Sequence, residues 1–128
     1  MFSNCSKIEK TKKRLDGTWN AVSYQYTTNL GFSYFYDAEG IIEFENCDED
    51  TCSYSIDLNY SNSTESGTKS EYGNYIFIDE EGEYFSLYRI GINGVDILDS
   101  GRIILITNSD LKIEYVDNIG RHIYTLEK

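Results

Sequence analysis

The chain has 128 residues, which is enough for one domain with a single hydrophobic core. Its net charge of -11 argues against nucleic-acid binding, because phosphate groups are bound by basic surfaces. No apolar run approaches the roughly 20 residues that span a bilayer. The sequence contains 12 tyrosines, 6 phenylalanines and no proline, and this composition favours strands over helices.

The N-terminal part of the chain differs from the rest. Residues 1–14 are polar and basic, and we interpret them as a leader or tether that precedes one domain at residues 15–128. Residues 6–15 are predicted to form one or two helical turns. The stretch from Leu15 to Trp19 leads into a first strand at residues 17–28, and Trp19 is expected to pack at one end of the core.

Strand signals and turn signals then alternate at short, regular spacing. Residues 53–60 are the clearest strand, because Tyr54, Ile56, Leu58 and Tyr60 alternate with polar residues and so indicate one buried face. Residues 61–70 are polar and are predicted to be the longest loop. Further strands are expected at residues 32–36, 41–46, 72–78, 83–90, 95–98, 102–107, 111–116 and 121–126.

This order predicts an all-β fold, namely an antiparallel up-and-down β-barrel of about eight to ten strands with a short N-terminal helical turn. The short turns leave only residues 61–70 for the long crossover that a Greek-key sandwich needs. The run from Ile103 to Ile106 shows no alternation, so periodicity does not identify its inward-facing residues.

Three short motifs lie along the chain. They are Leu15-x-Gly17-x-Trp19 at the first strand, Gly73-Asn74-Tyr75-Ile76-Phe77 followed by Glu81-Gly82, and Leu111-Lys112-Ile113-Glu114-Tyr115 followed by Gly120 and Leu126-Glu127-Lys128. Together they resemble the bacterial lipocalin-like domain family of small exported lipoprotein barrels. The resemblance implies a lipocalin-like barrel with Trp19 packed at its base and a pocket at the opposite, open end.

Cys5 follows Phe2-Ser3-Asn4, which resembles a degenerate bacterial lipobox. Together with the family resemblance, this predicts lipidation of Cys5, membrane contact only through that lipid anchor, and a periplasm-facing position in the bacterial cell envelope. The alternative is that Met1 is the native start, which predicts a cytoplasmic protein with an unmodified thiol at Cys5.

The other two cysteines, Cys47 and Cys52, bracket a predicted four-residue turn. Residues that face each other across a hairpin lie about 4.5–5.5 Å apart at Cα, so we predict a disulfide between them and maturation outside the cytosol. The competing interpretation is half a zinc site, but only Cys5 and His122 remain as ligands and they lack paired spacing. We therefore predict no metal site.

Two functions compete for this barrel, and neither involves catalysis or a cofactor. His122 is the only histidine, and no nucleophile motif accompanies it. In the first function, which we place ahead, the barrel binds a small, largely apolar ligand in its interior.

In the second function, bulky side chains fill the barrel and its outer face binds an envelope protein, as an interaction or inhibitor module would. A monomer is expected in both cases. The candidate interior residues are Trp19, Tyr54, Ile56, Leu58, Tyr60, Tyr75, Phe77, Phe85, Leu87 and Tyr115.

Overall fold

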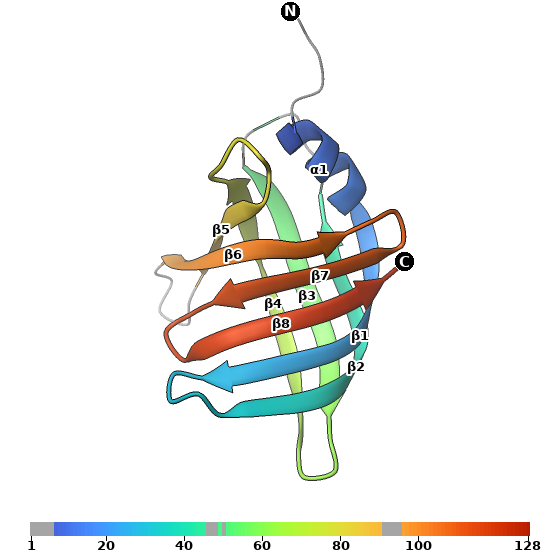
Figure 1. The fold of residues 1–128 in the computed structure, drawn as a ribbon, viewed down its shortest axis with the longest axis vertical. Coiled ribbons are helices and arrows are strands. Elements are labelled where there is room, and N and C mark those ends of the chain that lie inside the picture. The colour runs from blue at the N-terminus through green and yellow to red at the C-terminus, as the bar shows by residue number, and fades with distance from the viewer. Residues whose placement is uncertain (1–6, 46–48, 50, 91–95) are drawn as a thin grey trace, which may run out of the picture.

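The computed structural model describes residues 7–45, 49, 51–90 and 96–128, and these form a closed antiparallel β-barrel with a short N-terminal helix (Figure 1). Each strand pairs with the next one along the chain, and β8 pairs back with β1. The predicted up-and-down barrel is therefore confirmed, with eight strands in the described residues. The elements are α1 (Lys7–Leu15), β1 (Gly17–Thr28), β2 (Ser33–Phe44), β3 (Cys52–Ser61), β4 (Ser66–Phe77), β5 (Tyr84–Ile90), β6 (Asp96–Ile106), β7 (Asp110–Val116) and β8 (Gly120–Glu127).

Two predicted turns lie inside long strands. Residues 32–36 and 41–46, expected as separate strands, are largely parts of β2, and most of residues 95–98 and 102–107 falls in β6. The bend in β2 contains Gly40, which has a φ of +124°, and a Cβ there would lie 2.4 Å from the backbone oxygen of Asp57 in β3. Only glycine combines that conformation with so close a neighbouring strand, so this glycine marks strand curvature and not a chain reversal.

The predicted loop at residues 61–70 is wrong over its second half, because β4 begins at Ser66 and pairs with β3 from there. The actual turn is short. The side-chain oxygen of Asn62 accepts the backbone N–H groups of Thr64 and Glu65 at 2.8 and 2.9 Å, which holds the turn together. Polar composition suggested a loop here because this half of β4 carries polar residues on both faces.

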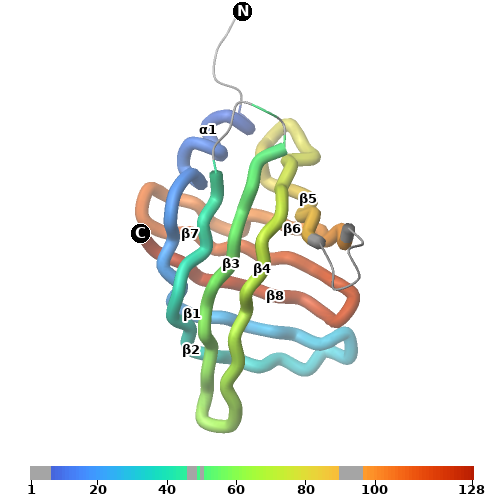
Figure 2. Tube along the Cα trace, turned by 180° about the vertical axis from the view of Figure 1, so that it is seen from behind, coloured from blue at the N-terminus to red at the C-terminus, as the bar shows by residue number. Residues whose placement is uncertain are grey.

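Helix α1 covers one end of the barrel, as the tube view from behind also shows (Figure 2). The indole Nε1 of Trp19 donates a 2.8 Å hydrogen bond to the carbonyl of Leu15, the last residue of α1. Lys12 donates to the backbone oxygen of Glu49 at 2.7 Å, and Lys7 forms an ion pair with Glu81 at 2.6 Å. The helix is therefore fixed both to the start of β1 and to the turns around this end, which we call the closed end.

The interior next to the closed end is apolar and densely filled. Trp19 is fully buried there, as predicted, and it packs among large aliphatic and aromatic side chains from the surrounding strands. These side chains alternate with outward-facing residues along each strand, which is the pattern of a filled barrel. The buried residues of this half are Leu15, Trp19, Ile42, Phe44, Phe77, Phe85, Ile103, Leu111, Ile113 and Leu126.

A β-bulge explains why the run from Ile103 to Ile106 shows no alternation. The register of β6 with β7 shifts between Ile103 and Leu105. Ile103 is buried at 7% exposed, whereas Ile104 and Leu105 are 40% and 48% exposed. The extra residue of the bulge explains why periodicity did not identify the inner face.

Some predictions concern residues that the structure does not describe. Cys5 and Cys47 lie outside the described residues, so the predicted lipidation and disulfide stay predictions, and Cys52 is buried at the start of β3. Within the described ranges, no helix combines the length and the apolar character that crossing a bilayer requires.

Replacing Gly40 with alanine should lower the free energy of unfolding by about 3 kcal/mol, because the substitution adds a positive-φ penalty to a clash with the β3 backbone. Gly31 provides a matched control, since its φ is +92° and nothing lies within 4 Å of a Cβ there. Gly31→Ala should cost only about 1–2 kcal/mol. Urea unfolding monitored by Trp19 fluorescence measures both values, and equal losses would contradict the close strand approach.

Candidate functional site

The half of the barrel interior away from α1 is lined by polar and ionisable side chains. They come from the inward-facing positions of β1 and of β3 to β8. They lie toward the end of the barrel with the turns at residues 29–32, 62–65 and 117–119, which we call the open end. We name this group the interior polar cluster. Its members are Tyr24, Tyr54, Lys69, Glu71, Arg89, Asp99, Tyr115, Asp117, His122 and Tyr124.

His122 is at the centre of the cluster and is only 1% exposed. Its Nε2 lies 2.9 Å from a carboxylate oxygen of Asp117, and a carboxylate can only accept, so Nε2 carries the proton. Nδ1 is then an acceptor, and the hydroxyl of Tyr24 donates to it at 2.6 Å. Burial, and next the charge of Lys69, lower the pKa of His122 to about 4 despite the opposing effect of Asp117. The imidazole is therefore neutral at physiological pH.

Lys69 reaches His122 from the opposite side of the interior. Its Nζ lies 3.3 Å from Nδ1 of His122 and donates to the hydroxyl of Tyr115 at 3.1 Å. It also lies 5.2 and 5.5 Å from the ring centroids of Tyr24 and Tyr115, within the range of a cation–π contact. Burial lowers the pKa of the Lys69 amine against the opposing charges of Glu71 and Asp117.

A second part of the cluster is built around Arg89. Its Nε donates to Asp99 at 3.0 Å and lies 3.8 Å from Glu71. Asp99 is 3% exposed, so this ion pair is largely removed from water. Tyr54 donates to the other oxygen of Glu71 over a longer distance, 3.5 Å, and burial raises the pKa of Glu71. Arg89 thus balances two carboxylates inside the barrel.

Closely packed tyrosine rings continue the cluster toward the open end. The ring of Tyr60 lies 5.0 Å from Tyr24 and 4.8 Å from Tyr36, measured between centroids. The hydroxyl of Tyr36 donates to Glu65 at 2.6 Å, and burial followed by this hydrogen bond raises the pKa of Tyr36 to about 12. Burial likewise raises the pKa of Tyr24 and Tyr115, so these phenols stay protonated and act as hydrogen-bond donors.

All ten candidate residues predicted from the sequence lie on inward-facing positions, but they are divided between the two halves. Trp19, Phe77 and Phe85 belong to the apolar, filled half. Tyr54 and Tyr115 belong to the interior polar cluster, and Tyr60 covers it. Their role in ligand binding stays a prediction. The remaining residues are buried between these groups, namely Ile56, Leu58, Tyr75 and Leu87.

Sequence reasoning missed the charged members of the site, although a signal was present. Lys69 and Glu71 continue the inner row of Tyr75 and Phe77 at every second position, and Arg89 does the same for Leu87. The alternation continued into residues whose polarity suggested a loop. Sequence reasoning missed Tyr24 for a different reason, which is a bulge in β1.

A bulge in β1 shifts the register between Ala21 and Ser23, so Trp19 and Tyr24 both face inward although they are five positions apart. Strict alternation places two such residues on opposite faces. The bulge therefore adds an aromatic donor to the interior that periodicity assigns to the outer face.

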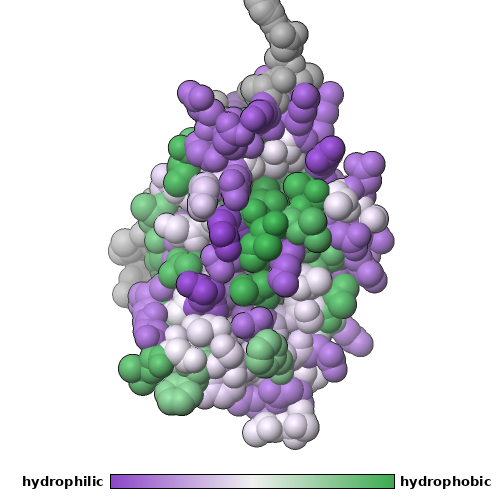
Figure 3. All heavy atoms as spheres, viewed as in Figure 1, coloured by the Kyte–Doolittle hydropathy of each residue, from purple (hydrophilic) through white to green (hydrophobic). Residues whose placement is uncertain are grey.

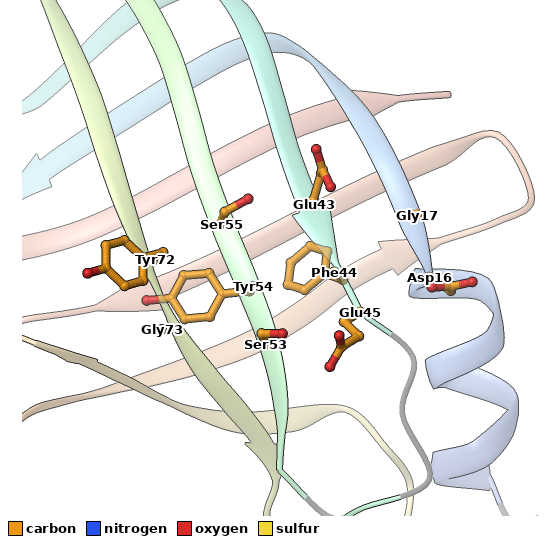
Figure 4. Close-up of a pocket in the computed structure, with 10 residues that line it drawn as sticks. All are labelled: Asp16, Gly17, Glu43, Phe44, Glu45, Ser53, Tyr54, Ser55, Tyr72 and Gly73. Atoms are coloured by element: carbon orange, nitrogen blue, oxygen red, sulfur yellow. The ribbon is translucent and has the colours of Figure 1, made fainter.

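The outer surface carries grooves across β3, β4 and β5. One groove of about 490 Å³ is lined by side chains from β2, β3 and β4, among them Glu43, Ser55 and Tyr72 (Figure 4). A neighbouring groove of about 610 Å³ shares Tyr72 and extends to Ile76 and Tyr88. Tyr72 is 71% exposed between the two. On the face seen in Figure 1, apolar surface occurs as patches among hydrophilic side chains, one at the centre over β6 and β7 and another over the β1–β2 hairpin (Figure 3).

Comparisons with family models, with curated proteins and with solved structures give no match to this chain. The likeness to lipocalin-like bacterial proteins therefore stays a prediction from short motifs. Over the residues that the structure describes, no group of three or more histidine, cysteine, aspartate or glutamate side chains is arranged to hold a metal ion. The chemistry of the site consists of hydrogen bonding and charge inside a barrel.

His122 should make the stability of the protein depend on pH below neutrality. Its pKa is about 4 in the folded state and about 6.5 when unfolded, so between these values the unfolded chain binds more protons. Stability therefore falls as the pH decreases from 6.5 to 4, by roughly 2–3 kcal/mol from this residue. The groups facing it are Tyr24 and Tyr26 from β1, Lys69 from β4, Tyr115 from β7 and Asp117 from the β7–β8 turn.

The variant His122→Gln isolates this effect, because it removes the titrating group while keeping hydrogen-bonding capacity. Chemical unfolding at a series of pH values should give a flatter dependence for the variant than for the wild type between pH 6.5 and 4. Identical slopes would show that other groups account for the acid sensitivity.

Proposed function

We propose that this protein is a non-catalytic carrier that binds a small, largely apolar ligand in the open half of its barrel. The observation that carries this proposal is the interior polar cluster, in which a lysine, an arginine, a histidine and several tyrosines converge inside an otherwise apolar core. Ligand sites combine apolar surface with placed polar groups, and the tyrosine rings and ionisable groups of this half supply both.

The distribution of polarity supports the open half as the binding region. The closed half is apolar, filled and covered by α1, so a guest there would have to displace packed side chains. Burying ionisable groups costs free energy, and replacing buried ion pairs by well-packed apolar residues is often neutral or stabilising. A role in holding a ligand's polar group explains why such residues are present.

The alternative function, an outer face that binds an envelope protein, has a specific observation in its favour. Tyr72 projects from β4 between two neighbouring grooves, and Tyr88 lines one of them. Exposed tyrosines next to grooves are typical of protein-binding surfaces. The two functions therefore use opposite faces of β4, with Lys69 and Glu71 inside and Tyr72 outside.

The compartment forms part of the proposal. We place the protein in the bacterial cell envelope, as a periplasm-facing lipoprotein anchored through Cys5 with a disulfide between Cys47 and Cys52 that matures outside the cytosol. Support comes from the residues before Cys5 and from the four-residue spacing between the two other cysteines, which predicts a short turn.

Ligand binding inside the barrel should depend on Tyr60 and not on Tyr72. Removing the Tyr60 ring takes away the aromatic contact over Tyr24 and Tyr36, so Tyr60→Ala should change the affinity for an apolar fluorescent probe at least about fivefold. Tyr72→Ala removes an exposed tyrosine on the neighbouring strand β4 and should leave the affinity for the probe unchanged. Probe titration by fluorescence gives both values. Sensitivity to Tyr72→Ala alone would place the ligand on the outer face and overturn the carrier function.

Intact mass spectrometry tests the disulfide. Material exported with its native signal should gain the mass of two hydrogens on reduction, and Cys52 should react with an alkylating reagent only afterwards. Substituting Cys47 with serine should remove the mass change, which serves as the control. Alkylation of Cys52 without reductant would contradict the pairing.

A further inference from the structure

Outward-facing basic residues of the strands gather on one part of the barrel. Among the lysine and arginine residues of the eight strands, Lys69 and Arg89 reach into the interior. The others, Arg102, Lys112 and Arg121, each lie between two buried residues on β6, β7 or β8 and therefore face outward. In a chain with a net charge of -11, the outer face of these three strands is the part of the barrel wall that attracts anions.

A groove of about 360 Å³ lies on this face and contains both arginines. Arg102 of β6 pairs with Glu114 of β7, and Arg121 of β8 pairs with Val116 of the same central strand. The register thus brings the two arginines to the groove from opposite sides of β7. Figure 1 shows the three strands side by side, and Figure 3 shows hydrophilic side chains next to the apolar patch there. We call this hollow the arginine groove, and its lining residues are Tyr84, Ser100, Gly101, Arg102, Glu114, Val116 and Arg121.

The two arginines share a single carboxylate. One oxygen of Glu114 lies 3.7 Å from Nε of Arg102, and the other lies 3.4 Å from Nε of Arg121. Over the described residues, no other carboxylate is within ion-pair distance of either guanidinium. Two positive charges therefore face one negative charge, whereas Arg89 inside the barrel has two carboxylates to itself. The arginine groove keeps an excess of one positive charge.

The hydrogen-bond donors of these arginines are also largely unused. A guanidinium has five N–H donors, and within the described part of the chain neither Arg102 nor Arg121 donates a hydrogen bond. Nε of Arg102 is buried and still has no acceptor, because Glu114 is too far away at 3.7 Å. Buried donors are normally hydrogen-bonded, so this nitrogen marks a guanidinium whose partners the described part of the barrel does not supply.

The depth of the three side chains decides what an incoming molecule meets. Glu114 is 14% exposed, whereas the side chains of Arg102 and Arg121 are 41% and 57% exposed. The carboxylate is therefore the deeper charge, and its closest contact to each guanidinium is through Nε. This leaves the terminal nitrogens, which carry four of the five N–H groups of an arginine, for a group that enters from solvent. Glu114 thus holds the two guanidinium groups together without using up their donors.

We propose that the arginine groove binds a phosphate monoester. Such a group has three terminal oxygens and a charge of about -1.5 to -2 at pH 7, so it can accept hydrogen bonds from two planar guanidinium groups at once. A carboxylate has only two oxygens, and one guanidinium occupies both in a bidentate pair. Tyr84 and Val116 are 44% and 42% exposed in the groove and offer apolar surface to the organic part of the ester. This site is on the outer face and does not rest on the carrier function proposed above.

A titration of the wild-type protein tests the site without any substitution. The probe is phenyl phosphate, which combines a phosphate monoester with a small aromatic ring. Nuclear magnetic resonance follows the side-chain Nε–H signals of the arginines in the full-length, ¹⁵N-labelled chain. We expect the signals of Arg102 and Arg121 to shift with one common affinity, while that of the interior Arg89 stays in place. Shifts confined to Arg14 in the basic helix α1, or the lack of any shift, would overturn the proposal.

Substitutions then separate the groove from general charge. Arg102→Gln and Arg121→Gln should each weaken the binding of phenyl phosphate at least about tenfold, because each removes one charged donor group from the anion. Lys112→Gln is the matched control, since it removes the same charge from the outer face of β7 but lies outside the lining of the groove. It should change the affinity by less than about twofold. Equal losses for all three variants would show a general charge effect and overturn the site.

Benzoate tests the chemical class of the ligand, because it places a carboxylate on the same aromatic ring. It should bind at least about tenfold more weakly than phenyl phosphate, and equal affinities would overturn the assignment to phosphate.

Vesicles distinguish the two sources of a phosphate monoester. Phosphatidylcholine vesicles with and without phosphatidic acid are sedimented with the wild-type protein and with the Arg102→Gln variant. Extra binding to phosphatidic acid that requires Arg102 would support the site with a lipid headgroup as its ligand. Binding of phenyl phosphate without this extra vesicle binding would support the site with a soluble ester.

Discussion

The pairing of β1 with β8 is the interaction on which the rest of the structure depends. It joins the first strand to the last along the whole length of β8, from Asn20–Glu127 to Thr28–Gly120, and turns a row of hairpins into a ring. A ring has an interior with no sheet edge, so every inward-facing side chain must find its partners inside. The polar cluster, the aromatic stacks and the apolar closed half are all consequences of this closure.

The two halves of the closed barrel differ because its two ends are covered differently. At the closed end, α1 and the hydrogen bond from Trp19 to Leu15 exclude water, and the side chains there are accordingly apolar. The open end has turns but no described helix over it, and there the inner rows change to tyrosine and charged residues. A hydrogen-bonded network is the condition for keeping such groups inside a barrel, and the partners of His122, Arg89 and Tyr36 meet it.

Much of the fold could be predicted from the sequence, because strand and turn signals are local. The strands at residues 17–28, 53–60 and 83–90 were predicted within a residue or so at each end, and Trp19 is in the core. The errors share one cause, which is that barrel strands are long and curved. In the sequence Gly40 indicates a turn, but in the structure it lets β3 approach a bent β2.

The candidate site was only half predictable, for a related reason. Apolar alternation identified Tyr54, Tyr60 and Tyr115, since tyrosine signals burial. Hydrophobicity gives no signal for a lysine or an aspartate that faces inward, and their burial depends on partners contributed by distant strands. Lys69 meets His122 across 53 positions in sequence, and Tyr24 meets it across 98. Only the register of the closed barrel brings these residues together.

The protonation state of His122 connects the stability of this barrel with its polar interior. A neutral imidazole with its proton on Nε2 donates to Asp117 and accepts from the hydroxyl of Tyr24 on Nδ1. An imidazolium would lose the hydrogen bond from Tyr24, because both of its nitrogens donate, and it would repel the Lys69 amine, which lies 3.3 Å from Nδ1. Burial lowers the pKa of His122 and so favours the neutral state. The neutral histidine therefore lets the barrel hold a lysine and a histidine side by side in its interior.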